Sequence, residues 1–187
     1  MNIPDNKAIN QPSVPLWVNG RPVPSTSLRS GAVTNPATGN IVRRVPFANA
    51  PDVDLAVKAA SAALPGWRDA PPLRRARVMQ KFLALMQANQ KELARLASEE
   101  HGKTLPDALG SVQRGIEVIE FACGIPHLLK GEYTENAGTG VDCHTLRQPV
   151  GVCAGITPFN FPAMVPLWMF PVAIACGNTF ILKPSEK

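Results

Sequence analysis

The sequence predicts an α/β protein with a parallel βαβ unit in its C-terminal part. Three observations lead to this class: an uncharged strand–helix–strand pattern over residues 148–182, helical spacing from about residue 52 to 126, and hairpin signals near the N-terminus. With 187 residues, of which 45% are hydrophobic and 18% charged, the chain has a globular composition and enough length for one core or slightly more.

The N-terminal region predicts a small β ribbon. In LWVNGRPV, Asn19-Gly20 lies between apolar residues, which is the strongest short signal for a hairpin. TNPATGN then predicts a turn, and IVRRVPF predicts the strand after it. Residues 1–14 carry no periodicity, so we expect them to fray.

Helical patterns follow and predict a helical layer. The first begins at Asp52, the expected N-cap after Pro51, and is expected to end at Pro65-Gly66. A longer pattern reaches about Gly102, and a third runs from near residue 105 toward residue 126. In the longer helix the apolar residues expected to face inward are Val78, Phe82 and Leu85.

The net charge of +5 raises the question of a nucleic-acid partner, since Arg74, Arg75 and Arg77 cluster. We expect these arginines to form a solvated helix face instead, because no basic stripe with interleaved aromatic residues is present. The four cysteines show no CxxC spacing and the three histidines no metal-ligand pattern, which predicts free thiols and no metal site. Residues 1–7 lack an apolar run, so a cytoplasmic location is expected.

Two stretches in the last third of the chain stand out. Residues 131–147 are polar and glycine-rich and then alternate, which predicts an exposed loop with an edge strand or hairpin that pairs with a partner chain or needs shielding. Residues 148–182 contain no Asp, Glu, Lys or Arg. A membrane anchor over residues 158–182 is the weaker interpretation, because four prolines and several polar residues interrupt the run.

The preferred interpretation of residues 148–182 is the βαβ unit. PVGVCAGI and NTFILK read as two fully buried parallel strands, and AMVPLWMFPVAIAC as the crossover helix, although Pro171 inside that helix should kink or shorten it. Ligands collect at the carboxyl ends of parallel strands. The polar segments TPFNFP and KPSEK follow the two strands, so a ligand site is expected there.

The motifs NPATG, HGKT, GITPFNFP and MFPVAIACGNTFILKPSE, in this order, resemble the aldehyde dehydrogenase superfamily and within it the methylmalonate-semialdehyde dehydrogenase subfamily. The resemblance covers nearly the whole chain after the first dozen residues. It implies NAD-dependent oxidation of malonate or methylmalonate semialdehyde through a cysteine thioester. The acyl group of this thioester is then transferred to coenzyme A with loss of carbon dioxide, and the product is acetyl-CoA or propionyl-CoA. It also implies a homo-oligomer, a dimer or tetramer. From the residues themselves we expect neither a nucleic-acid nor a membrane partner.

The resemblance assigns roles to several residues. Asn160 matches the asparagine whose amide donates to the oxyanion of the tetrahedral intermediate, while Thr157 and Phe159 line the cofactor path. From the residues alone, Asn160 could equally satisfy its own turn and Phe159 could be a core aromatic.

Lys183 and Glu186 match the pair that binds the adenosine ribose, and Lys187 is expected to be a neighbouring contact. A carboxylate at residue 186 accepts from the 2'-hydroxyl and repels a 2'-phosphate, which favours NAD over NADP. No GxGxxG motif accompanies them, and solvation of an ordinary loop is the alternative. Arg114 corresponds to an arginine near the substrate carboxylate, or is simply a surface residue.

None of the four cysteines, Cys123, Cys143, Cys153 and Cys176, matches the motif of the family's nucleophile, which lies further along the chain in the family. Residues 1–187 are therefore expected to be the N-terminal part of an NAD-binding domain, with residues 131–147 as an oligomerisation element, and to be inactive alone. The alternatives are another aldehyde dehydrogenase subfamily and a non-catalytic cofactor-binding or interaction fragment.

Overall fold

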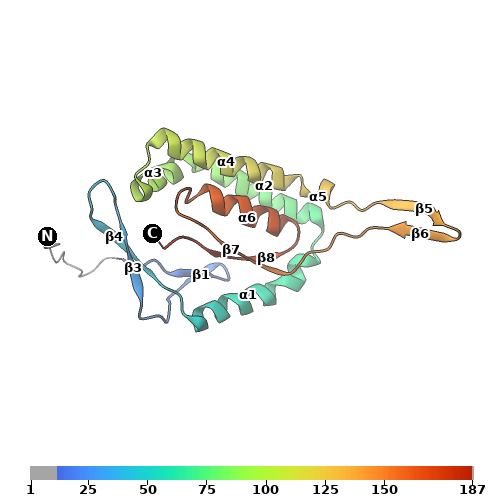
Figure 1. Cartoon of the computed structure of the whole chain (residues 1–187), viewed down its shortest axis with the longest axis horizontal. Coiled ribbons are helices and arrows are strands. Elements are labelled where there is room, and N and C mark those ends of the chain that lie inside the picture. Colours follow the sequence, from blue (N-terminus) through green and yellow to red (C-terminus); the bar gives the residue numbers. More distant parts are fainter. Residues whose placement is uncertain (1–11, 187) are drawn as a thin grey trace.

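A computed structural model describes residues 12–186, so most of the stretch expected to fray lies outside the described residues. Residues 12–14 are paired rather than frayed, because the Val14 amide donates to the Arg44 carbonyl at 2.8 Å and the Arg44 amide donates to the Pro12 carbonyl at 3.2 Å. Each sheet within the described range has two strands. The molecule is elongated, with a helical body and a hairpin that projects from one end (Figure 1).

Two antiparallel ribbons open the fold and confirm the sequence prediction. Their strands are β1 (Leu16–Val18), β2 (Arg21–Val23), β3 (Ser30–Thr34) and β4 (Ile41–Pro46). Asn19 and Gly20 have φ values of 53° and 74°, the left-handed conformation that a two-residue hairpin with this twist requires at both central positions.

Helix α1 (Ala50–Arg68) begins and ends differently from the prediction. Its N-cap is Asn49, whose Oδ1 accepts from the Asp52 amide at 3.0 Å, while the Asp52 carboxylate accepts from the Asn49 amide at 3.2 Å. Asp52 is thus the reciprocal partner in a capping box, a position that also favours an acidic residue. The helix continues through Pro65, which is exposed, so that water can reach the carbonyl left without an N–H donor.

The predicted longer helix is two helices that meet at Asn89, and the face it buries was predicted only in part. Phe82 is half-buried, as expected, and packs against Phe170 with ring centroids 5.7 Å apart. The helical layer consists of α2 (Pro72–Ala88), α3 (Gln90–His101), α4 (Leu105–Cys123) and the short α5 (Ile125–Leu128). Val78 and Leu85 are exposed, whereas Arg75 and Met79 are buried. The Arg75 guanidinium donates to the carbonyls of Ala175 at 3.0 Å, Arg68 at 3.3 Å and Ala70.

Arg75 therefore does not belong to a solvated face. It binds carbonyls at the C-terminal ends of α1 and α6, where a positive charge interacts favourably with the helix dipole. Burial lowers the pKa of this guanidinium from its usual value. Arg74 and Arg77 are exposed, as expected.

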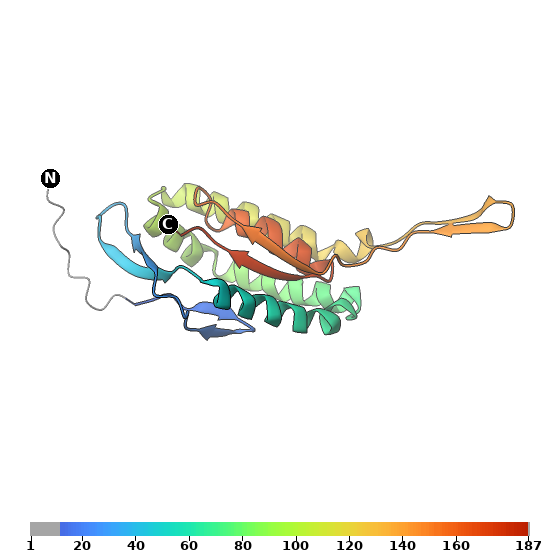
Figure 2. The same ribbon diagram turned by 60° about the horizontal axis from the view of Figure 1, so that its bottom comes forward.

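The predicted βαβ unit is confirmed. β7 (Val152–Ile156) pairs in parallel with β8 (Thr179–Lys183), and α6 (Met164–Ala175) connects them. Helix α6 continues through Pro171, which is fully buried. The parallel strands of this unit lie between α1 on one side and α6, backed by α2 and α4, on the other (Figure 2).

The prediction of fully buried strands was wrong for this chain. Ile156 is 75% exposed and Val152 37%, because within residues 12–186 β7 and β8 have only each other as sheet neighbours. A wider Rossmann-like sheet is not seen in this range. None of the helices in residues 12–186 is long and apolar enough to cross a membrane.

Helix α4 is the centre of the helical layer. Val112, Ile116 and Ile119 are almost completely buried, and Gly115 lies directly against the Leu167 side chain of α6. Because glycine has no Cβ, the two helices can approach closely at this point.

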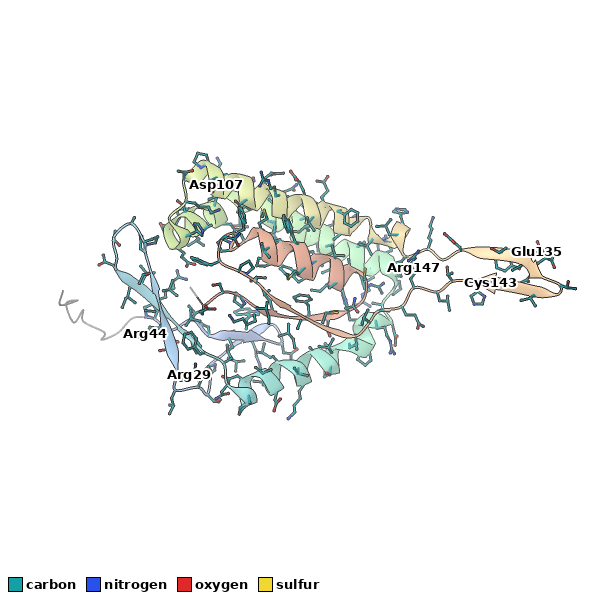
Figure 3. The ribbon with its side chains drawn as sticks, in the orientation of Figure 1. Arg29, Arg44, Asp107, Glu135, Cys143 and Arg147 are labelled. Atoms are coloured by element: carbon teal, nitrogen blue, oxygen red, sulfur yellow. The ribbon has the colours of Figure 1, made fainter. Side chains whose placement is uncertain are left out.

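Residues 131–147 contain the predicted hairpin, formed by β5 (Tyr133–Gly138) and β6 (Val141–His144). Every residue of both strands is exposed. Glu135 and Cys143 lie on the projecting part and Arg147 near its base (Figure 3).

Candidate functional site

The polar segments after β7 and β8 meet at one edge of the parallel pair, as predicted. Ile156 and Lys183 are register partners, and the Thr157 amide donates to the Lys183 carbonyl at 3.2 Å. Thr157 is 5% exposed. The parallel register thus places the TPFNFP turn beside the start of KPSEK, where open α/β sheets bind ligands.

Asn160 is exposed in the turn between β7 and α6. Within residues 12–186 its side chain forms no hydrogen bond, so the structure does not support the alternative in which Asn160 satisfies its own turn. The turn leads directly into α6, whose first bonds include Val165 N–H to the Phe161 carbonyl at 3.2 Å. A neutral amide at a fixed turn is able to donate to an anionic oxygen.

The two aromatic neighbours of Asn160 contact a segment that the sequence analysis did not assign to the site. The ring of Phe159 packs on His101, with centroids 5.3 Å apart, and the Lys103 ammonium lies 4.4 Å from the centroid of Phe161. The only sequence signal for this segment was the HGKT motif, which carried the family resemblance but no role. Phe159 is half-buried rather than a full core residue.

Lys183 and Glu186 are close together, as the resemblance implies. Lys183 Nζ lies 2.9 Å from Glu186 Oε2, and both side chains are about half exposed, at 55% and 52%. An ammonium and a carboxylate at this spacing provide one donor and one acceptor for a pair of vicinal hydroxyl groups. Lys187 lies outside the described residues.

Arg114 is exposed on α4 and forms no hydrogen bond or ion pair within residues 12–186. No contact joins it to Asn160 or to Lys183 in this part of the chain. Within the described residues the Arg114 guanidinium is therefore accessible to a carboxylate ligand.

The cysteines show no sign of an activated nucleophile. Burial raises the pKa of Cys123, to which nearby Glu120 adds, and burial raises the pKa of Cys176 against the opposing effect of Arg75. Both groups are therefore protonated thiols at neutral pH, which are weak nucleophiles. Cys143 is exposed on the hairpin and Cys153 is half-buried in β7.

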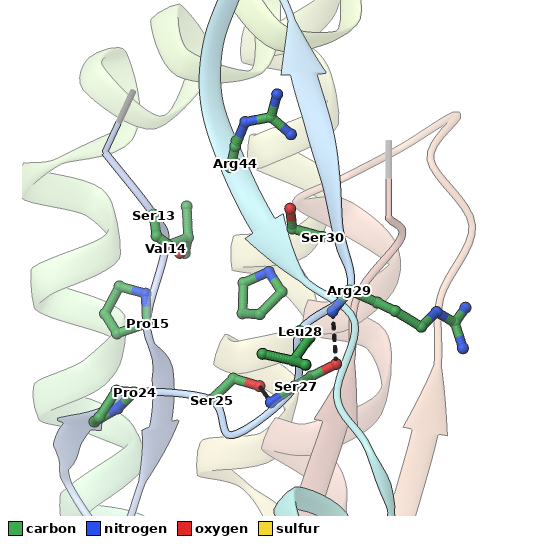
Figure 4. A pocket seen from close by; sticks show the side chains of 11 residues that line it. Ser13, Val14, Pro15, Pro24, Ser25, Ser27, Leu28, Arg29, Ser30 and Arg44 are labelled. Carbon is green, nitrogen blue, oxygen red and sulfur yellow. Dashed lines mark hydrogen bonds between the residues drawn. The ribbon is translucent and has the colours of Figure 1, made fainter. Parts of the chain in front are cut away.

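A separate pocket lies between the N-terminal ribbons, lined by Val14, Pro24, Leu28 and several serines (Figure 4). Two of its four serine hydroxyls are already engaged, since Ser25 Oγ accepts from the Ser27 amide at 3.0 Å and Ser27 Oγ accepts from the Arg29 amide at 3.2 Å. The Arg29 side chain extends away from the other lining residues.

Comparisons with known proteins show the family to which the chain belongs. Residues 23–187 match the model of the aldehyde dehydrogenase family. Malonate-semialdehyde dehydrogenase of Pseudomonas aeruginosa is 54% identical over 170 residues, which are 91% of this chain and 34% of that protein. The acylating mitochondrial methylmalonate-semialdehyde dehydrogenase of Arabidopsis thaliana is 52% identical over 176 residues, or 94% of this chain and 29% of that protein.

Solved structures give the same result. A Sinorhizobium meliloti protein assigned as a methylmalonate-semialdehyde dehydrogenase and complexed with NAD superposes with a TM-score of 0.92 at 52% identity, over 95% of this chain and 36% of that one. An NADP-dependent enzyme of Escherichia coli superposes with a TM-score of 0.88 at 32% identity, over 93% of this chain and 36% of that one. The chain spans about a third of the length of these relatives, and it belongs to the aldehyde dehydrogenase family.

Proposed function

We propose that this chain supplies the oxyanion donor and the ribose-binding pair of a coenzyme A-acylating malonate- or methylmalonate-semialdehyde dehydrogenase. The observation that carries the proposal is the exposed amide of Asn160, which has no hydrogen-bond partner within residues 12–186 and follows β7 at the edge where β8 ends in the Lys183–Glu186 pair. The activity is expected of a protein of the relatives' full length that contains this chain.

The part of Asn160 in this chemistry is electrostatic. A thiolate adds to the aldehyde carbonyl carbon, and the carbonyl oxygen takes up the negative charge. The Asn160 amide would donate a hydrogen bond to that oxygen, which stabilises the tetrahedral adduct more than the planar aldehyde. The family resemblance implies that the thiolate comes from a cysteine beyond position 187. The raised pKa values of Cys123 and Cys176 support this, because both thiols stay protonated at neutral pH.

Thr157, Phe159, Lys183 and Glu186 are the residues we propose for NAD, with Lys187 as an additional contact. NAD would accept the hydride that the adduct loses. Lys183 would donate to a ribose hydroxyl oxygen and Glu186 would accept from a hydroxyl group. The 2.9 Å pair fits this role, since one diol can bridge both charges.

Substrate and assembly complete the proposal. Arg114, exposed and without a partner in the described range, would bind the carboxylate of a malonate-type semialdehyde. The acyl group would leave on coenzyme A. The hairpin of residues 131–147 would join copies of the protein in a dimer or tetramer, and its fully exposed strands support such a contact.

The decisive test replaces Asn160 in the full-length protein. We expect Asn160→Ala to lower kcat by roughly 100- to 1,000-fold with methylmalonate semialdehyde, NAD and coenzyme A, since one oxyanion donor is lost. Asn160→Asp should be at least as damaging, because it has the same shape but opposes the negative oxygen. Asn40→Ala, at another exposed asparagine, is the control. An unchanged kcat in Asn160→Ala would refute the role.

Cofactor choice needs its own test, because the fold occurs in NAD-bound and NADP-dependent proteins. Glu186→Gln should narrow the preference for NAD over NADP, by roughly tenfold in the ratio of kcat/KM values, because it removes the repulsion of a 2'-phosphate. Lys183→Ala should weaken the binding of NAD and of NADP by a similar factor. Equal ratios in wild type and Glu186→Gln would exclude Glu186 from the site, and the chain would then fit the alternative of another subfamily or a non-catalytic module.

A further inference from the structure

The turn that carries Asn160 is held on both sides by one segment, His101–Lys103. His101 packs on Phe159, and Lys103 lies over Phe161. These two phenylalanines are the immediate chain neighbours of Asn160. Contacts on both sides restrict the backbone torsions that decide where the Asn160 amide points.

The holding segment is itself fixed in place. Gly102 ends α3 with φ at 84°, and its amide donates to the Ser98 carbonyl at 2.8 Å. The Ser98 hydroxyl donates to the Lys103 carbonyl at 2.7 Å. Thr104 then begins α4 as its N-cap, so the segment is tied to the ends of two packed helices.

A third motif braces this segment from behind. A Cβ atom on Gly102 would lie 2.8 Å from Cγ of Pro36, which belongs to the NPATG turn. NPATG, HGKT and TPFNFP are far apart in the sequence but lie side by side in the fold. Pro36 contacts Gly102, and the two neighbours of Gly102 contact the rings on either side of Asn160.

The charge of Lys103 is unusual for a merely structural contact. Its side chain is 6% exposed, and its ammonium is paired with Asp107 at 3.1 Å, near the start of α4 (Figure 3). A buried ammonium costs free energy that an apolar residue of similar size would avoid, even when it is paired. His101 adds a second polar group, because its Nδ1 atom is buried and has no hydrogen-bond partner within residues 12–186.

We propose that His101 and Lys103 are positioning residues, which hold Phe159 and Phe161 so that the Asn160 amide faces the reacting carbonyl oxygen. The proposal rests on the proposed function of Asn160. The cation over the Phe161 ring and the imidazole that packs on Phe159 at an interplanar angle of 36° fix direction as well as distance, which a purely apolar contact does not. Preorganised donors depend on such support, because a misplaced donor stabilises the transition state poorly.

The test is a double-mutant cycle between Lys103 and Asn160 in the full-length protein. Lys103→Met keeps the length of the side chain and removes the charge; we expect it to lower kcat roughly tenfold, with little change in KM for NAD. In the Asn160→Ala background the same substitution should change kcat by less than about twofold, because the donor it positions is gone. Lys103→Arg should restore most of the activity, and Lys91→Met, on the exposed face of α3, is the matched control.

A measurement without turnover completes the test. In the nucleotide-free protein, amide hydrogen exchange at residues 159–161 should be several-fold faster in Lys103→Met than in wild type or Lys91→Met, because the turn is no longer held from one side. Wild-type kcat in Lys103→Met, in an enzyme that Asn160→Ala impairs, overturns the positioning role alone. Equal losses in both backgrounds would also overturn it and indicate a structural role. Wild-type kcat in Asn160→Ala overturns the positioning role together with the proposed function.

Discussion

The pairs β7–β8 and β5–β6 are both two-stranded sheets, but they are held together by different means. The parallel pair is fixed by α6, by α1 and by buried polar residues such as Asn178. The antiparallel hairpin is fixed by its own turn and by exposed bonds around Asp142, which accepts from Tyr133 Oη at 2.7 Å and from the Asn136 amide at 3.0 Å. Tertiary packing therefore determines the geometry of the site, whereas the hairpin is a local structure.

The largest difference in stability between the two sheets should come from disturbing the contact between α4 and α6. Gly115→Ala places a Cβ against Leu167, whose Cβ would be only 3.1 Å away, and we expect it to destabilise the chain by about 1–3 kcal/mol. Gly110→Ala, in the same helix with no atom within 4 Å of the new Cβ, should stabilise it by up to about 1 kcal/mol.

Urea unfolding of both variants measures the difference, and hydrogen exchange locates it. Exchange in β7 and β8 should speed up in Gly115→Ala, while exchange in the hairpin should not. Equal stabilities of the two alanine variants would show that the close approach of α4 and α6 contributes nothing to the fold.

The same contrast explains what the sequence could predict. Asn19-Gly20 and the uncharged run from residue 148 to 182 carry local patterns, so the ribbon and the βαβ unit were predicted correctly. The burial of Arg75 depends on where the end of α6 lies, 100 residues further along the chain, and no helical period contains that information. Asn49 and Asp52 are both good capping residues, so only the reciprocal hydrogen bonds distinguish the cap from its partner.

The candidate site divides in the same way. The sequence could predict that Thr157 and Lys183 lie close together, because the rule for parallel strand ends depends only on topology. His101 and Lys103 were missed as site residues because their contacts to Phe159 and Phe161 join segments more than fifty positions apart. A histidine and a lysine at the end of a helix look like ordinary C-terminal residues.

A smaller loss of stability should follow from removing the Asn178 side chain, which links the end of α6 to the start of the parallel strands. Asn178 Oδ1 accepts from the Gly151 amide at 2.9 Å, and its Nδ2 donates to the Ala173 carbonyl at 3.0 Å. Asn178→Ala removes both part-buried bonds: the Gly151 amide loses this partner, while the Ala173 carbonyl keeps the bond from the Asn178 main-chain amide at 3.1 Å. We therefore expect a loss of about 1–2 kcal/mol. Asn40→Ala, in an exposed turn, should change stability by less than about 0.5 kcal/mol. If Asn178→Ala unfolds at the wild-type urea midpoint, the Asn178 side-chain hydrogen bonds do not stabilise the parallel pair.

The smallest effect should follow from a change in the hairpin. Tyr133 and Asp142 are exposed; their hydrogen bond raises the pKa of Tyr133, while the Asn136 amide and then the Tyr133 hydroxyl lower the pKa of Asp142. Tyr133→Phe removes one of these bonds and leaves the other. Because the strands bury no side chain against the body, the urea midpoint should stay unchanged. Amide exchange within residues 133–144 should become only about three- to tenfold faster, the range that one net hydrogen bond allows. A lowered midpoint in Tyr133→Phe would mean that the hairpin unfolds together with the body, and the two sheets would then belong to one cooperative unit.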